Sequence, residues 1–113
     1  MTIFSKIIRG EIPCKKVYED DLVLAFDDIS PGAPCHVLII PKQEGIQNLN
    51  DVDGSHAALL GHMLVTARKV AELKGVAAGG YRTVLNTGND AGQSVYHIHM
   101  HVLGGRDLSW PPG

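Results

Sequence analysis

The alternation of apolar and polar positions along the chain predicts five strands and two helices. Short apolar or β-branched runs bounded by turn-forming residues predict strands over 16–19, 22–27, 35–40, 81–86 and 95–103. Apolar residues at helical spacing predict a short helix over 2–9 and a long helix over 55–74. The predicted buried stripe of the long helix consists of Leu59, Leu60, Met63, Leu64, Ala67, Val70 and Ala71. Because the strands are mostly consecutive, the order favours an α+β fold with a meandering, mostly antiparallel sheet.

The last predicted strand contains the sequence His-Ile-His-Met-His at residues 97–101. Side chains of a strand alternate between its two faces, so His97, His99 and His101 are expected to share one face. The apolar residues between them are expected to point into the core. Three side chains that titrate near neutrality on one face suggest proton transfer, nucleophilic attack, metal binding or anion binding. The spacing therefore predicts a site, without choosing its chemistry.

Composition limits the class of protein. The chain has 113 residues, of which 44% are hydrophobic and 19% charged, so we expect one ordered domain over 1–113. A net charge of −2 provides no basic field for nucleic acid, and no apolar run is long enough for a membrane span. The N-terminal segment lacks the apolar stretch of a secretion signal, so a cytoplasmic location is expected. Cys14 and Cys35 form no Cys-x-x-Cys pair and are expected to be ordinary small apolar side chains.

A glycine-containing loop over 86–94 precedes the histidine segment. Its two glycines let a ligand approach the main chain closely, and exposed N–H groups in such turns bind anions. Asn86, Gln93 and Ser94 add polar side chains. The same residues are ordinary turn formers, but beside three aligned histidines they favour a phosphate site that includes Gly92.

These motifs resemble those of a known family. The pattern His-apolar-His-apolar-His-apolar-apolar, over 97–103, is that of the histidine-triad (HIT) superfamily. The neighbouring segments look like its histidine-triad nucleotide-binding branch. The segments that carry this likeness are 4–13, 26–31, 92–96, 104–106 and 110–113, so the resemblance covers nearly the whole chain.

The resemblance implies a HIT-like dimeric fold and a purine nucleoside phosphoramidase or nucleotidyl hydrolase that uses no metal or other cofactor. In that family the middle histidine, here His99, attacks the α-phosphorus and forms a nucleotidyl-histidine, which water then hydrolyses. His101 would hydrogen-bond the phosphoryl oxygens, and Ser94 would contact the phosphate or the leaving nitrogen. His36 and His97 would form a supporting layer. From the residues alone, His36 is equally well explained as a partly buried histidine bonded to a carbonyl.

The resemblance also assigns the nucleotide-binding residues. Asp28 would bind the ribose hydroxyls, although an aspartate before a Ser-Pro-Gly turn is often a turn cap. Asn86, Gly92 and Gln93 would line the phosphate site. The base would lie between apolar residues that otherwise read as core, which are Phe4, Ile7, Ile12, Phe26 and Ile29.

The last segment, 104–113, is expected to be a tail. By resemblance, Trp110 would pack at a homodimer interface near the active site of the neighbouring subunit. The alternative is a tail that folds back on its own subunit.

Three other functions are consistent with the same residues. His-x-His on a strand is good zinc geometry, and Cys35 or a third imidazole would complete a tetrahedral site. A non-catalytic nucleotide-binding module would use the same pocket. A dinucleoside polyphosphate hydrolase is a closer alternative, against which the Gly-Gly-Arg sequence at 104–106 and the Trp-Pro-Pro-Gly ending argue.

Overall fold

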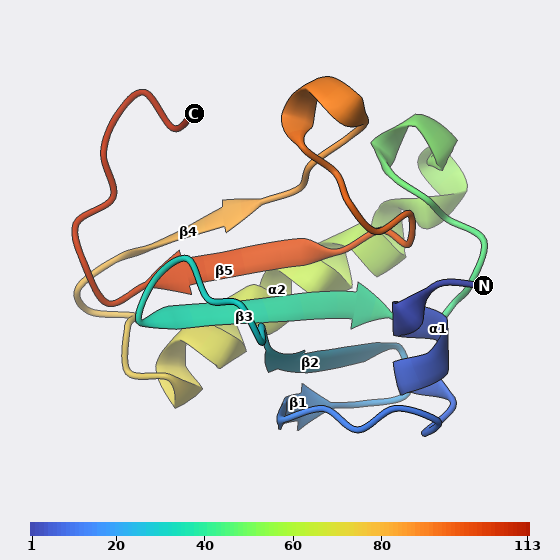
Figure 1. The fold of residues 1–113 in the computed structure, drawn as a ribbon, viewed down its shortest axis with the longest axis horizontal. Helices are drawn as coiled ribbons and strands as arrows, with labels where there is room; N and C mark the ends of the chain where they lie inside the picture. The colour runs from blue at the N-terminus through green and yellow to red at the C-terminus, as the bar shows by residue number, and fades with distance from the viewer.

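The structure, a computed structural model of residues 1–113, consists of one antiparallel sheet with a helix on each face (Figure 1). The strands are β1 (Lys16–Glu19), β2 (Val23–Asp27), β3 (Cys35–Pro41), β4 (Tyr81–Val84) and β5 (Met100–Gly104). The helices are α1 (Ile3–Ile8) and α2 (Ala57–Leu73). The predicted α+β fold with five strands, one long helix and one short helix is confirmed.

The strand order is β1-β2-β3-β5-β4, so the predicted meander is interrupted at its end. Helix α2 follows β3 and crosses behind the sheet, and the next strand, β4, lies at the edge (Figure 1). The last strand then returns between β3 and β4 and pairs antiparallel with both. This insertion places β5, with its histidine, beside the well-buried strand β3.

The face of the sheet covered by α2 carries the main core. Alternate residues of β2, β3 and β5 point toward the helix, as the period of a strand requires. The cluster consists of Val23, Ala25, Cys35, Val37, Ile39, Met63, Ala67, Val70, Ala71, Val76, Met100 and Val102. The prediction that Met100 packs into the core is therefore confirmed.

A capped turn leads into α2, and a glycine follows its end. Asp53 accepts a hydrogen bond from the Ser55 N–H at 2.9 Å, and its own N–H donates to Nδ1 of His56 at 3.0 Å. A short 3₁₀ turn, Gly54–His56, therefore precedes the α-helix. At the other end Gly75 adopts a φ of +73°, a left-handed conformation that favours glycine.

The buried stripe of α2 is narrower than predicted. Leu64 is 55% exposed, so its assignment to the stripe is wrong, whereas Thr66 is buried. The face that meets the sheet is centred on Met63, Ala67 and Val70, and Leu64 lies at its margin. Because the core is small, it contacts only the middle of the apolar face of the helix. The spacing of apolar residues in the sequence does not show how wide that contact is.

The face covered by α1 carries a smaller apolar cluster. It consists of Phe4, Leu24, Phe26, Leu38 and Ile40. Thr2 begins α1 by accepting a hydrogen bond from the Ser5 N–H at 3.2 Å. A helix of 6 residues cannot cover the sheet as α2 does, so part of this face stays open.

The predicted strand over 95–103 is wrong in its first half, because β5 begins at Met100. In the ladder Met100 pairs with Ile39, and two residues further along β3 stands Pro41. Proline has no N–H to donate, so the ladder is not continued there. His97 and His99 therefore lie in an irregular segment, and only His101 lies on a strand.

The irregular segment is nevertheless anchored. The N–H of Ile98 donates to the carbonyl of Ile46 at 2.9 Å. The ring of Phe4 in α1 lies edge-on to His97 and His99, with centroids 6.1 and 5.0 Å away, and the His99 and His101 rings are 5.0 Å apart. The three imidazoles therefore gather on the α1 side of the sheet, as predicted, although the backbone that carries two of them is not a strand.

None of the helices combines the length and the apolar character that crossing a membrane would require.

Candidate active site

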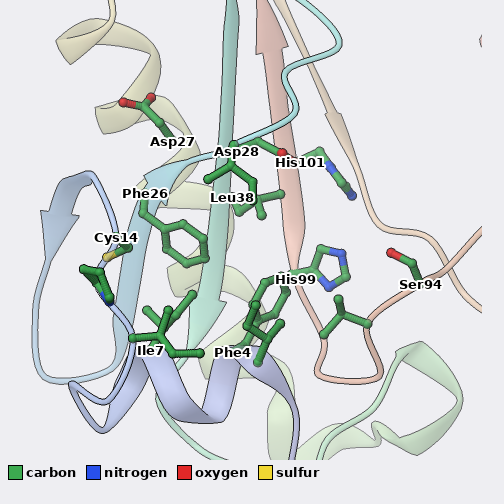
Figure 2. A pocket seen from close by; sticks show the side chains of 15 residues that line it. Phe4, Ile7, Cys14, Phe26, Asp27, Asp28, Leu38, Ser94, His99 and His101 are labelled. Carbon is green, nitrogen blue, oxygen red and sulfur yellow. The ribbon is translucent and has the colours of Figure 1, made fainter.

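A cavity of about 300 Å³ opens on the α1 face of the sheet (Figure 2). It is bounded by α1, β2, β3 and the segment that leads into β5. The residues that line it are Ile3, Phe4, Ile7, Ile12, Pro13, Cys14, Phe26, Asp27, Asp28, Ile29, Leu38, Ser94, Val95, His99 and His101. Most of these are apolar, and the polar groups gather at the end that carries the histidines. The arrangement suits a ligand with a flat apolar part and a charged end.

His99 is 7% exposed, and its ring is oriented by the backbone. Its Nδ1 lies 2.8 Å from the carbonyl oxygen of His97, which can only accept, so Nδ1 carries the proton and donates. The other nitrogen, Nε2, then keeps a free lone pair. Burial lowers the pKa of His99, against the opposite effect of the His97 carbonyl. A neutral imidazole with a free lone pair is the form that can act as a nucleophile.

His97 does not line the cavity, but it supports the residue that does. Its side chain is 3% exposed, and its Nε2 donates to the carbonyl of Pro41 at 2.9 Å. Its own carbonyl fixes the ring of His99. The structure thus places His97 behind the cavity.

His101 and His36 form a pair across β5 and β3. Nε2 of His36 lies 2.8 Å from Nδ1 of His101. The remaining nitrogen of His101, Nε2, is buried and has no partner within the chain. Burial lowers the pKa of His101 to about 4, and the neighbouring His99 and His36 act in the same direction. His101 is therefore neutral at pH 7, with one nitrogen free to contact a ligand in the cavity.

Asp28 lies at the end of β2, on the rim of the cavity. One carboxylate oxygen accepts from the Ser30 N–H at 2.8 Å, which is the turn cap that the sequence offered as the alternative. The other oxygen, Oδ2, lies 3.4 Å from Nε2 of His36. Asp28, His36 and His101 each bring one potential ligand atom within 4.8 Å of the others. Capping and ligand contact are thus compatible for Asp28, because the two oxygens face different neighbours.

The apolar residues assigned to the base do line the cavity. The rings of Phe4 and Phe26 meet edge-on with centroids 5.7 Å apart, and Ile7 packs against them from α1. Ile29 is 94% exposed at the mouth, which no packing requirement explains. Burial therefore separates two roles among these residues: Phe4 and Phe26 are also core, and Ile29 is not.

Several lining residues were missed by the sequence analysis, namely Ile3, Pro13, Cys14, Asp27, Leu38 and Val95. Leu38 could have been found, because it stands two residues from His36 on β3 and thus shares its face. Asp27 is turned toward α2 rather than into the cavity (Figure 2), and pairs with Lys74 at 2.7 Å. The others depend on tertiary approach and carry no local signal.

In the loop before β5, one predicted residue lines the cavity and others hold the loop in place. Ser94 lines the cavity, but Asn86, Gly92 and Gln93 do not. Gln93 is 7% exposed, and its amide is fully used within the chain. Its Nε2 donates to the carbonyls of Gln47 and Val95, and its Oε1 accepts from Asn48 and from the Gly88 N–H. The structure therefore makes Gln93 a clamp that holds the loop.

Trp110 lies away from the cavity and is 81% exposed. The tail that carries it is held to its own subunit by a hydrogen bond from Nη2 of Arg82 to the carbonyl of Ser109, at 3.0 Å. The backbone of the tail therefore contacts β4 of its own subunit, whereas the Trp110 ring is not packed on that subunit.

Comparison with known proteins agrees with this geometry. The model of the HIT domain family matches residues 9–108. This chain belongs to the HIT family. Over 107 residues, 95% of this chain and 89% of the relative, the HIT domain is 59% identical to a protein of Escherichia coli K12 named purine nucleoside phosphoramidase.

A solved structure and a plant protein are also similar to this chain. A crystal structure of a HIT family hydrolase from Legionella pneumophila superposes with a TM-score of 0.96 at 50% identity, covering 100% of both chains. A maize protein named 14 kDa zinc-binding protein is 53% identical over 113 residues, which is 99% of this chain and 88% of the relative. The fold is thus that of HIT family hydrolases.

Proposed function

We propose that this HIT protein is a purine nucleoside phosphoramidase, which hydrolyses the P–N bond of nucleoside 5′-phosphoramidates to a nucleoside monophosphate and an amine. The observation that carries the proposal is the state of His99. Its Nδ1 proton is held by the His97 carbonyl, and its Nε2 is directed to a cavity with an apolar end for a base. The name of the Escherichia coli relative, at 59% identity, supports the choice of the P–N bond.

In the first step, the lone pair on Nε2 of His99 forms a bond to the α-phosphorus. The P–N bond of the substrate breaks, and its electron pair leaves with the amine, which takes a proton from solvent at the open, Ser94 side of the cavity. The nucleotidyl-imidazole retains its Nδ1 proton and is therefore cationic. The His97 carbonyl stabilises that charge, because it lies 2.8 Å from Nδ1.

In the second step, water attacks the phosphorus and loses a proton to solvent, and the bond to Nε2 breaks, which returns His99 to its neutral form. Splitting one difficult substitution into two easier ones is the advantage of a covalent intermediate. His101 serves both steps in this proposal, since its unpartnered Nε2 faces the space that a phosphoryl oxygen would occupy.

The nucleoside would lie along the apolar part of the cavity. Asp28 accepts from the ribose hydroxyls, and Phe4, Phe26 and Ile29 contact the base. An apolar slot with few polar groups distinguishes bases poorly, so the purine preference rests on the name of the relative rather than on these contacts. Asn86 and Gly92, outside the cavity itself, would shape the phosphate loop.

We also propose that the protein acts as a homodimer, in which Trp110 docks near the partner's cavity. The support is that an indole ring 81% exposed on one subunit leaves a large apolar surface in water. The last residues, 110–113, lie beyond the hydrogen bond between Arg82 and Ser109 and are exposed, so they are available to contact a neighbouring subunit.

The test is incubation of the protein with adenosine 5′-phosphoramidate, followed by chromatography for AMP. Rapid acid-free quenching and mass spectrometry of the peptide that contains His99 should find an added adenylyl group. Absence of AMP release, with AMP binding intact, would favour the non-catalytic module. Faster cleavage of diadenosine tetraphosphate than of the phosphoramidate would favour the dinucleoside polyphosphate hydrolase.

The proposed chemistry is independent of metal. The grouping of Asp28, His36 and His101 and the name of the maize relative make zinc the competing explanation. Protein treated with a chelator and then shown to be metal-free should turn over at the untreated rate. A rate that vanishes with the metal and returns with added zinc would replace the proposal.

A further inference from the structure

The Gly-Gly-Arg sequence that follows β5 lies outside the cavity, yet it contacts the residues that support it. Nη2 of Arg106 donates to the carbonyl of Gly32 at 2.8 Å, across 74 residues of sequence. The preceding Gly105 has a φ of +89°, and a Cβ there would lie 3.0 Å from Cβ of Pro34. Strand β5 therefore ends in a segment that is packed tightly against the turn between β2 and β3.

Gly32 in that turn is engaged at both of its backbone groups. While its carbonyl accepts from Arg106, its N–H donates to Nδ1 of His36 at 2.8 Å. A backbone N–H can only donate, so Nδ1 of His36 must present a lone pair. A proton on that nitrogen would face the Gly32 proton directly.

The identity of this one acceptor determines the rest of the chain of hydrogen bonds. A neutral imidazole has one N–H, so the proton of His36 lies on Nε2. That atom faces Nδ1 of His101 at 2.8 Å and the carboxylate of Asp28 at 3.4 Å, which are both acceptors. His101 then accepts at Nδ1 and carries its own proton on Nε2, the buried atom with no partner in the chain.

We propose that the Gly32 N–H, held in place by Arg106, sets the tautomers of His36 and His101, so that His101 presents an N–H rather than a lone pair to the phosphoryl group. Arg106 and Gly32 are positioning residues in this scheme, because neither lines the cavity. The inference deepens the proposed function and rests on it for the role of His101. In the opposite tautomer, Nε2 of His101 would direct a lone pair at a negatively charged oxygen, which repels it.

Two matched pairs of variants test the Gly32 N–H and the Arg106 guanidinium, each against a control that keeps the hydrogen-bond donor. Gly32→Pro removes the N–H, whereas Gly32→Ala retains it. The added Cβ of alanine would lie 3.7 Å from Nδ1 of His36, which is ordinary contact. Arg106→Met removes the guanidinium but keeps an apolar stem, whereas Arg106→Lys keeps a positively charged hydrogen-bond donor. Arg106 is exposed, so neither change at that position should prevent folding.

The main measurement is the tautomer of each histidine in the ¹⁵N-labelled protein, from long-range ¹H–¹⁵N spectra at pH 7. In the wild type we expect protonated Nε2 on His36 and on His101, and protonated Nδ1 on His99. In Gly32→Pro and Arg106→Met, the His36 and His101 signals should shift toward mixed tautomers, while His99 stays unchanged as an internal control. Gly32→Ala and Arg106→Lys should keep the wild-type pattern.

The second measurement is the kinetics of the same variants with adenosine 5′-phosphoramidate. We expect kcat to fall by about tenfold or more in Gly32→Pro, less in Arg106→Met, with little change in KM, because the affected hydrogen bond matters most in the transition state. Gly32→Ala should lose less than Gly32→Pro.

Several results would overturn the inference. One is a wild-type His36 with its proton on Nδ1. Another is a Gly32→Pro protein that keeps both the wild-type tautomers and the wild-type kcat. If Gly32→Pro does not fold, unchanged tautomers in Arg106→Met decide against the role of Arg106, and the wild-type spectrum still decides the tautomer. Failure of the proposed function is distinct, since it would appear as wild-type protein with the expected tautomers and no release of AMP.

Discussion

The two faces of the sheet are made by the same strands but differ in what covers them. On the α2 face, 12 buried apolar residues form a continuous core under a helix of 17 residues. On the α1 face, the cluster has 5 buried residues under a helix of 6, and the remaining area is a cavity with histidines at one end. A chain of 113 residues thus accommodates both a core and a site. One face provides most of the apolar burial, so that the other can remain open.

The division follows the period of the strands. In β3, Val37 and Ile39 point to α2, while His36 and Leu38 point to the cavity side. In β5, Met100 points to the core and the next residue, His101, to the cavity. Neighbouring residues of one strand are therefore expected to respond to substitution in different measurements, stability for one and kinetics for the other.

The largest effect is expected at His99 on the cavity side. His99→Ala removes the proposed nucleophile, so kcat for adenosine 5′-phosphoramidate should fall by about 10⁴-fold or more. AMP binding, measured by calorimetry, should survive, because the apolar walls and Asp28 remain. The free energy of unfolding, measured by urea denaturation, should change by no more than about 1 to 2 kcal/mol, since the side chain borders an existing cavity. A variant that retains more than a few per cent of the wild-type rate would place the nucleophile elsewhere.

The matching effect on the other face is a loss of stability. Ile39 has no exposed surface and lies in the main core. Ile39→Ala should lower the free energy of unfolding by about 2–5 kcal/mol, measured by urea denaturation, with kcat of the folded fraction close to that of the wild type.

Leu38→Ala is the neighbouring control, because its side chain lines the cavity. It should raise KM through a poorer fit to the base and destabilise the protein less than Ile39→Ala. If the two variants show the same loss of stability and the same change in KM, the functional difference between the two faces does not hold.

A more moderate effect on kcat/KM is expected when the pH is lowered. Burial lowers the pKa of His99 below the ordinary value of 6.5 and that of His101 to about 4. Both rings are therefore still neutral somewhat below pH 6.5, and the acid limb of the kcat/KM profile should have its midpoint below that value. A midpoint at or above 6.5 would contradict the assignment of these buried rings to the rate.

The same shifts predict how stability responds to pH. As the pH falls below about 6.5, unfolded chains bind protons at these histidines more readily than the folded protein does, and for His101 this difference extends down to about pH 4. The unfolded state is thus favoured as the pH falls through this interval, and the contribution of these groups is fully present above it. Urea denaturation at several pH values should show the decline, and the His101→Gln variant should show a smaller one.

The fold could be predicted largely from the sequence because its elements carry strong local patterns. The apolar runs of β2 and β3 and the period of α2 are visible in the sequence, and so is Gly75 at the end of the long helix. The position of β4 at the edge could not be predicted, since it depends on how α2 crosses the sheet. The early end of the β3–β5 ladder depends on the register that places Pro41 beyond the last pair.

The candidate site shows the same limit. The His-x-His-x-His pattern predicted rings on one side of the molecule, and the apolar partners Phe4 and Phe26 do lie beside them. The clamp by Gln93 could not be predicted, because it joins segments 46 residues apart through backbone carbonyls. Contacts of a side chain with a distant backbone leave no pattern in composition or spacing.

The smallest effect on stability is expected from the tail, which belongs to neither face. Residues 108–113 lie outside the sheet, and Trp110 is 81% exposed. Their removal should change the free energy of unfolding by only about 0.5 kcal/mol at a concentration where the protein is fully dimeric or fully monomeric. Turnover should change more, and differently for phosphoramidates with small and bulky amines, if the tail reaches the partner's cavity. The single substitution Trp110→Ala should reproduce most of that change, because the ring is the main apolar surface of the tail. If truncation markedly lowers the free energy of unfolding and leaves the ratio of rates for the two amines unchanged in the folded protein, the tail is a structural element of its own subunit.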